Sequence, residues 1–436
     1  MRSVIAAMCV VALGAGCAGP SASYKQEVNR HIAARDWAGA ARIIEQSRAY
    51  EYGPGNEVLY YLDEAALLHD AGAFVQSDAL FDRAELRMEE LFTKSVTRGA
   101  ATFLVNDNTT MYSGQVHERV LLHVYRALNY AYMGKTDDAV VEARKVSAYL
   151  AELNDRLGQS RLAFEDDPFA QYLSALLFED QGRTDDARIS YKLAQEAYAR
   201  SARELGVGAP RFDPGGHSPD EGELVFLHYA GPGPRRDTMT LQVAWGNAMA
   251  LVQASDVAER DMRVRNALVA GVAGNAITVA LPRFVQDPYL IQGSDVEIAG
   301  VAGRTLVVED VTRLARSTLQ SALPAIQARA VVRATTKYML ARLAQRQAEA
   351  QLGQGWGSLV GLAAQFTSAA TETADTRCWA TLSAQIRMAR VWLPPGVHTL
   401  KVRYLGAGGA QVGEDMLPGV EIRSGRRTYV HVRTSS

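Results

Sequence analysis

The sequence predicts an α+β protein of several domains, in which a solenoid of helix pairs precedes a mixed α/β domain and a small β module. Two observations predict this arrangement. Helix-type hydrophobic periodicity with turns marked by glycine recurs through residues 24–205. The segment at residues 206–222 is rich in proline and glycine. After it, the helix-type periodicity gives way to short β-branched and aromatic runs bounded by turn residues, which are typical of strands. Most strands are therefore expected in the second half.

The composition is that of an ordinary globular protein. Of the 436 residues, 48% are hydrophobic and 22% charged, which argues against a collagen, a disordered chain or a polytopic membrane protein. The 46 Lys and Arg side chains are balanced by 48 Asp and Glu side chains. Because nucleic-acid binding needs a basic field, no nucleic-acid partner is expected. Three cysteines cannot build a disulfide framework.

The N-terminus has the pattern of a signal peptide. Arg2 precedes an uncharged apolar run at residues 4–15, which is too short for a helix that spans a bilayer of about 30 Å. Small residues then lead to Cys17, and this end resembles the bacterial lipobox. Leu13 stands four residues before Cys17, one more than the lipobox prefers. The alternative is a secretory signal peptide cleaved near Ala18.

The lipobox resemblance implies a cellular location. It implies that residues 1–17 are a lipoprotein signal in which Cys17 is lipidated and becomes the mature N-terminus. The residue that follows is Ala18 rather than the aspartate that retains such proteins at the inner membrane. The resemblance therefore implies a lipid anchor in the outer membrane that faces the periplasm, with residues 18–23 as a tether.

Four segments of the first half share one pattern. The two clearest read GKTDDA at residues 134–139 and GRTDDA at residues 182–187. In each, glycine permits the left-handed end of one helix, threonine caps the next, and alanine allows close packing. Weaker copies are Gly72, Ser77, Phe81 and Ala84, and Arg35, Ala40, Ile44 and Ser47. These offsets resemble the second half of the tetratricopeptide repeat over residues 24–205. The alternative is a helical bundle without repeats.

A wider resemblance covers most of the chain. The runs YSGQVHERV at residues 112–120, DPFAQY at 167–172, ADTRCW at 374–379 and LPPG at 393–396 carry it. They resemble an uncharacterised family of bacterial tetratricopeptide-type outer-membrane lipoproteins. The resemblance implies the location and the repeat type, and it brings no activity to carry over.

A partner-binding site is predicted near residues 99–114, an insertion that interrupts the repeats at one place. The following helix carries Tyr125, Asn129 and Tyr132 at i, i+4 and i+7, which places them on one face. Together with Tyr112 they could hold an extended segment, since tyrosine gives contact area at low entropic cost. The alternative is that the loop fills the groove and that the tyrosines are internal packing.

The second half divides into three parts. Residues 206–222 are expected to be a linker, residues 223–385 a mixed α/β domain, and residues 386–436 a C-terminal β module with a Pro-Pro-Gly turn. Two helices are expected at residues 309–321 and 324–352, separated by Pro324. The expected strands are residues 223–229, 276–281, 294–299 and 304–308.

The helix expected at residues 324–352 bears a basic stripe. Arg329, Arg333 and Lys337 fall at i, i+4 and i+8 on one face. The stripe could meet anionic lipid head groups or an acidic glycan, and the alternative is a solvated helix face.

The motif search predicts no enzyme. The chain contains none of the nucleophile-elbow, phosphate-loop, HExxH or CxxC patterns, so no catalytic residues, metal or cofactor are expected. The favoured hypothesis is a non-enzymatic, periplasm-facing lipoprotein scaffold that binds envelope proteins of unknown identity. The alternative is an enzyme or ligand-binding module with a pocket in residues 220–385.

Overall fold

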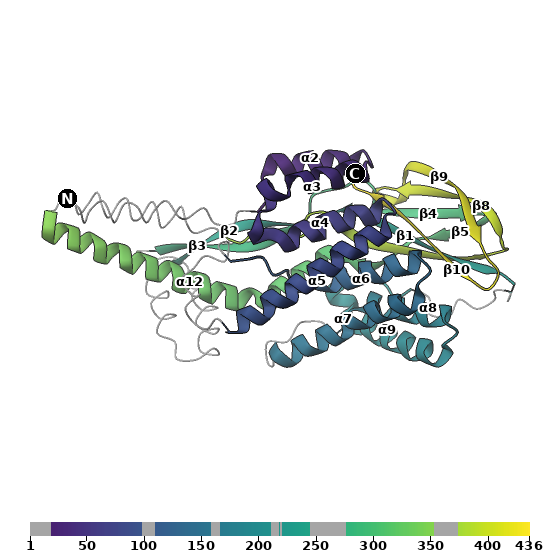
Figure 1. Cartoon of the computed structure of the whole chain (residues 1–436), viewed down its shortest axis with the longest axis horizontal. Helices are drawn as coiled ribbons and strands as arrows, with labels where there is room; N and C mark the ends of the chain where they lie inside the picture. Colours follow the sequence, from purple (N-terminus) through teal and green to yellow (C-terminus); the bar gives the residue numbers. More distant parts are fainter. Residues whose placement is uncertain are drawn as a thin grey trace.

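The computed structural model describes residues 19–97, 110–157, 166–210, 218, 220–244, 276–352 and 374–436. The predicted signal peptide with Cys17, most of the insertion at residues 99–114 and much of the linker at 206–222 lie outside these ranges. The chain is an α+β protein, with helices α2 to α9 in the first half and the strands with helix α12 in the second (Figure 1).

The first half consists of four consecutive helix pairs. They are α2 (Ala22–Ala33) with α3 (Trp37–Ser47), α4 (Glu57–Asp70) with α5 (Phe74–Thr97), α6 (Val116–Tyr132) with α7 (Thr136–Leu157), and α8 (Pro168–Asp180) with α9 (Thr184–Leu205). A π-helical turn at Arg48–Tyr52 and a 3₁₀ turn at Pro54–Asn56 join the first pair to the second.

The predicted turn chemistry of these pairs is confirmed. Gly72, Gly134 and Gly182 have φ values of 76°, 71° and 71°, and Arg35 takes the same left-handed region at 57°. Glycine is favoured there because it has no Cβ to clash with the backbone. Each turn is followed by a buried small residue, as the repeat pattern requires, for example Ala187 at 2% exposure.

One detail of the turns differs from the prediction. The helix α9 begins at Thr184, so its N-cap position is Arg183, which makes no side-chain cap. The expected threonine cap is therefore wrong for this helix. Asp185 and Asp186 still lie in its first turn, where negative charge is favourable against the helix dipole.

The strands of the described residues form two four-stranded sheets and one ribbon. The first sheet has the order β10 (Arg427–Thr434), β1 (Gly222–Pro232), β7 (Ser383–Leu393), β6 (Leu306–Asp310). The second has the order β5 (Val301–Arg304), β4 (Gly293–Ile298), β8 (Gly396–Leu405), β9 (Gln411–Ile422), with a 3₁₀ turn at Ala407–Gly409 before β9. β2 (Arg235–Ala244) and β3 (Ala276–Val285) form the ribbon. All pairings are antiparallel except β1 with β10.

The helices, the first sheet and the second sheet make three layers, with β1 in the middle. Alternate side chains of a strand point to opposite faces. Val225, Leu227 and Tyr229 belong to the core shared with the helices. Leu224 and Phe226 belong to the core shared with the second sheet. Both faces of β1 are therefore buried.

The expected separate C-terminal β module is not observed. Its boundary at residues 385/386 falls inside β7, which pairs with both β1 and β6. The last strand, β10, pairs with β1 on the other side. Because β1 is buried on both faces, its backbone groups on both edges need hydrogen-bonding partners, and the C-terminal strands supply them.

Pro324 does not separate two helices. A single helix, α12 (Val311–Leu352), spans 42 residues with Pro324 inside it, so the expected division is wrong. Proline costs one backbone hydrogen bond but keeps a helical φ, and packing along a long helix can offset that loss. α12 packs on the ribbon through Ala328, Val331 and their neighbours, and the two extend together from the body (Figure 1).

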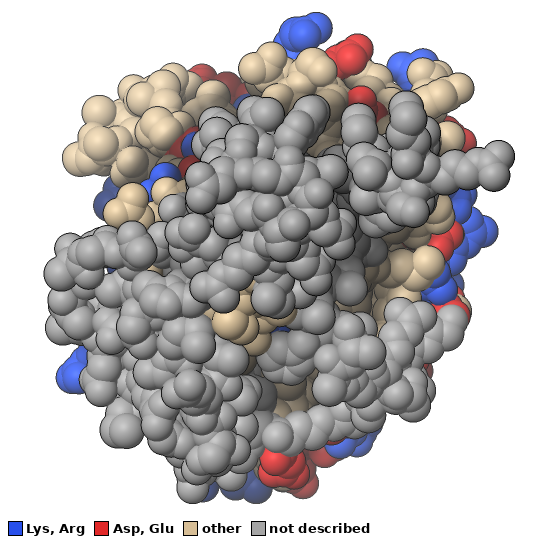
Figure 2. Space-filling model, turned by 90° about the vertical axis from the view of Figure 1, so that its left-hand side faces the viewer, with Lys and Arg blue, Asp and Glu red and all other residues tan. Residues whose placement is uncertain are grey.

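One end of the molecule shows both signs of charge. Viewed from the end where α12 projects, Lys and Arg side chains lie beside Asp and Glu side chains at the visible rim (Figure 2). Among the described residues, none of the helices combines the length and the apolar character needed to cross a membrane.

Candidate functional site

Three of the four predicted partner-binding residues lie inside the protein. Tyr112, Tyr125 and Asn129 are 3%, 1% and 0% exposed, and all three sit where the helices meet the first sheet. The Asn129 amide donates to Ser77 Oγ at 3.0 Å, and its oxygen lies 2.6 Å from His69 Nδ1.

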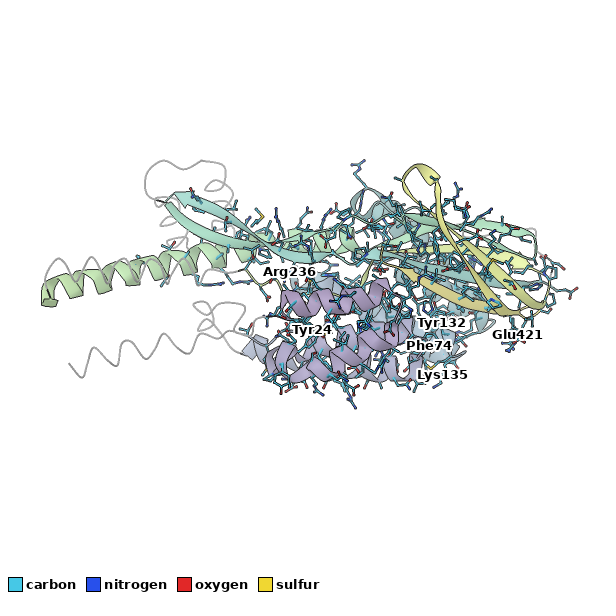
Figure 3. The ribbon with its side chains drawn as sticks, turned by 90° about the horizontal axis from the view of Figure 1, so that it is seen from above. Tyr24, Phe74, Tyr132, Lys135, Arg236 and Glu421 are labelled. Atoms are coloured by element: carbon cyan, nitrogen blue, oxygen red, sulfur yellow. The ribbon has the colours of Figure 1, made fainter. Side chains whose placement is uncertain are left out.

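Tyr132 and the hydroxyl of Tyr112 are also committed to internal contacts. The Tyr132 ring stacks on Phe74 with 4.7 Å between the ring centres, and both side chains lie together in Figure 3. The Tyr112 hydroxyl donates to Glu118 Oε2 at 2.6 Å. The burial of Tyr112, Tyr125 and Asn129 favours the alternative, internal packing, because a partner could reach these three only if the core opened. Tyr132 is partly buried and also lines a groove at the surface.

The two described arginines of the predicted basic stripe are not fully exposed. Arg333 is 5% exposed and Arg329 is half-buried, while the side chain of Lys337 lies outside the described part of the chain. The i, i+4 spacing correctly placed the two arginines on one side of α12. That side is partly covered by the rest of the protein.

The ADTRCW run serves as a structural anchor. The backbone N–H groups of Ala380 and Thr381, just after the run, donate to Asp63 Oδ1 at 3.0 and 3.1 Å. The N–H of Trp379 donates to Glu118 Oε1 at 2.7 Å. Two buried carboxylates of the helices thereby hold the segment that leads into β7.

Cys378 is not an activated nucleophile. Burial raises the pKa of its thiol to about 11, so the thiol keeps its proton near neutral pH. A reactive thiol needs the opposite shift, toward a lower pKa.

A three-residue group on α5, α6 and α7 has ligand types that suit a metal. The ligand atoms of Glu85, His123 and Glu142 lie within 4.8 Å of one another. Two cations already occupy this group, however. Arg126 Nη1 bonds to Glu85, and Lys145 Nζ lies 3.0 Å from carboxylate oxygens of both Glu85 and Glu142. We interpret it as a buried ion network that joins three helices.

A large groove lies between the last helix pairs and the first sheet, with a volume of about 2070 Å³. Its helical side is lined by residues of α6, α8 and α9, and its sheet side by residues of β7, β9 and β10. Tyr132 and Glu421, both labelled in Figure 3, belong to these two sides. This is the candidate functional site.

An ion network forms the floor of the groove. Arg427 of β10 donates to Glu223 Oε2 at 2.7 Å, to Asp180 Oδ1 at 2.6 Å and to Glu179 Oε2 at 2.8 Å. Arg390 bonds to the other Glu223 oxygen. These carboxylates tie the end of α8 to β1 and β10, so their charges are used to hold the two layers together.

The rim of the groove has cations that are not used in this way. Lys192 of α9 and Arg426, next to β10, are exposed and their side chains make no ion pair with any described residue. Tyr191 and Trp392 also line the groove, and the Arg390 guanidinium lies over the Trp392 ring at 4.8 Å from its centre. The groove therefore offers free positive charge beside aromatic surface.

Sequence reasoning missed the groove. Glu223 and Arg427 are 204 residues apart, and no local pattern links them. The sequence predicts a strand at residues 428–432 within a small antiparallel C-terminal unit, whereas the structure pairs this strand with β1 in parallel.

Comparison with known proteins adds no family. No protein-family model, no curated protein and no solved structure matches this chain. The function is therefore inferred from the chemistry of the groove.

Proposed function

We propose that this protein is a non-enzymatic lipoprotein scaffold, anchored in the outer membrane and facing the periplasm, that binds partner proteins of the envelope. The observation that carries the proposal is the groove between the helix pairs and the first sheet. Its size suits a segment of polypeptide, and its floor is a fixed ion network rather than a set of free acids and bases.

The helix pairs support a tetratricopeptide-type array. Left-handed turns at Gly72, Gly134 and Gly182, each followed by a buried small residue, recur in successive pairs. Arrays of this kind present binding surfaces without supplying chemistry. Here the first sheet covers one side of the array, so the binding surface is displaced to the groove at its end.

The groove suits an extended segment with acidic side chains. β10 is an edge strand, and residues Arg427 to Val430 of this strand line the groove. An edge strand can pair with an added strand through its free backbone groups. Acidic side chains on that strand would meet Lys192 and Arg426.

A crosslinking experiment tests the groove. A photo-crosslinking amino acid is placed at Lys192 in one strain and at Arg83, an exposed site on α5, in another. We expect envelope proteins to be captured from Lys192 and not from Arg83. A capture pattern that is the same at both positions would refute the groove as the binding site.

Affinity for the captured protein then tests the charges. Lys192→Glu with Arg426→Glu should weaken binding by about tenfold or more, since each reversal turns attraction into repulsion. The matched control is Arg30→Glu with Arg83→Glu. It changes the net charge by the same amount, but at exposed positions of α2 and α5. Equal affinity of both double variants would remove the electrostatic argument.

The anchor needs its own test. Cys17→Ser should move the protein from the membrane fraction to the soluble fraction and abolish acyl labelling. If the variant stays in the membrane fraction and is labelled as before, the lipobox interpretation is wrong.

The second candidate is an enzyme or ligand-binding module in residues 220–385. One observation favours the ligand-binding form: a smaller cavity beside β7 contains Arg387, just beyond that range.

A further inference from the structure

A second cavity, of about 430 Å³, lies between β7 and residues 286–292, which connect β3 to β4. Arg387 and Gln385 line it from β7, and Tyr289 and Gln292 line it from the connection. The volume falls within the range of about 300–1,000 Å³ that is usual for small-molecule sites. None of the residues that line the large groove lines this cavity.

The connection is fixed by hydrogen bonds at both ends. Gln286 Nε2 donates to the carbonyl of Pro232 at 2.8 Å, and the backbone N–H of Gln292 donates to the carbonyl of Leu405 at 2.8 Å. The cavity wall is thereby tied to β1 and β8. A wall that is already ordered does not have to be ordered when a ligand binds.

Arg387 brings a positive charge that no described carboxylate balances. Its guanidinium donates to Gln385 Oε1 at 3.0 Å, to the Thr305 carbonyl at 3.3 Å and, more weakly, toward Thr305 Oγ1 at 3.4 Å. All these acceptors are uncharged, whereas the buried guanidiniums of Arg390 and Arg433 each pair with a carboxylate. Burial lowers the pKa of Arg387. A half-buried charge of this kind favours an anion beside it.

Further hydrogen-bond donors line the same cavity. The Tyr289 ring packs directly over the backbone of Gly231, where a Cβ would lie 2.8 Å from the ring, so a larger residue at position 231 would displace it. Burial raises the pKa of Tyr289, which keeps its hydroxyl protonated and able to donate. The Gln292 amide makes no side-chain hydrogen bond with any described residue.

We propose that this cavity binds the carboxylate of a small ligand, with Arg387 as its counter-charge and with Tyr289 and Gln292 as additional donors. One cation matches one negative charge. Asp287 also lines the cavity, and Asp310 accepts a hydrogen bond from Gln385, so a dianion such as phosphate would meet further negative charge. The carboxylate can belong to a free acid or to the end of a peptide chain. This site is independent of the proposed scaffold function.

Thermal unfolding and calorimetric titration of the full protein test the proposal. The probes are sodium acetate for a free acid, N-acetylglycine for a chain end, N-acetylglycinamide as the uncharged match, and inorganic phosphate. We expect a saturable rise in melting temperature with the carboxylates and none with the amide or phosphate. Tighter binding of N-acetylglycine than of acetate supports a chain end, and equal binding supports a free acid.

Variants locate the binding. Arg387→Met should abolish carboxylate binding, while Arg304→Met, which removes an exposed guanidinium on β5, should leave it unchanged. If Arg387→Met fails to fold, Tyr289→Phe decides, because it removes only one hydroxyl and should weaken binding about tenfold. The proposal is overturned if neither carboxylate binds, if the amide or phosphate binds equally well, or if carboxylate affinity is unchanged in Arg387→Met or Tyr289→Phe.

Discussion

Replacing Glu309 with glutamine is expected to remove a loss of stability that the wild-type protein suffers as the pH rises. Glu309 of β6 and Asp167, the N-cap of α8, are both 0% exposed and meet where the helices contact the first sheet. Burial, and then the charge of Asp167, raises the pKa of Glu309 well above its ordinary value. Burial raises the pKa of Asp167 to about 6.

The sign and size of the effect follow from proton linkage. A carboxyl whose pKa is higher in the folded protein stabilises the fold fully below its unfolded pKa of about 4.3, and this contribution is lost as the pH rises toward the folded pKa. The loss is about 1.4 kcal/mol per pH unit. From pH 5 to pH 7, wild type should therefore lose up to about 2.7 kcal/mol relative to Glu309→Gln, which has no proton to lose.

Urea unfolding of both proteins across this pH range measures the difference in the free energy of unfolding. Glu204→Gln serves as the control, because Glu204 is exposed on α9 and its replacement should leave the pH dependence of wild type unchanged. If the free energies of unfolding of wild type and Glu309→Gln differ by the same amount at every pH, then Glu309 has the same pKa in the folded and the unfolded protein. The assignment of a protonated, buried Glu309 would then be wrong.

Three substitutions test the packing. Ala187→Leu should lower the free energy of unfolding by about 1–3 kcal/mol, since Ala187 is 2% exposed between helices; an unchanged melting temperature would contradict this position. Asp63→Asn should cost about 1–3 kcal/mol because an amide cannot fully replace the carboxylate that accepts from Thr381; unchanged urea unfolding would show that this anchor is dispensable. Asn129→Ala should cost a similar amount by unpairing His69; lost partner binding at unchanged stability would instead restore Asn129 as a binding residue.

Local chemistry made the helix pairs predictable. A glycine such as Gly134, followed five positions later by a small residue such as Ala139, specifies a left-handed turn and a close helix contact without help from distant residues. The structure has both, with a φ of 71° at Gly134 and 0% exposure at Ala139. The same reasoning placed the Pro-Pro-Gly turn between β7 and β8.

Contacts between distant segments explain what could not be predicted. The stripe of Tyr125 and Asn129 has the helical spacing expected of either a binding face or a core face. In the structure β1 packs against this side, and the ring centres of Tyr229 and Tyr125 are 5.7 Å apart. This contact with a distant segment makes the face part of the core. The cavity around Arg387 likewise needs residues 286–292, which are far from it in sequence.

Because β1 pairs with a strand that is made much later, the order of synthesis leaves one edge of β1 unpaired for a time. This strand is made near the middle of the chain, but its neighbour β10 is made about 200 residues later, with Glu223 and Arg427 separated by 204 positions. Until then β1 has an open edge and apolar side chains on both faces, which is what proteases and chaperones recognise in unfinished chains. Pairing with β10 covers this edge, so a chain that lacks residues 427–434 would leave it open.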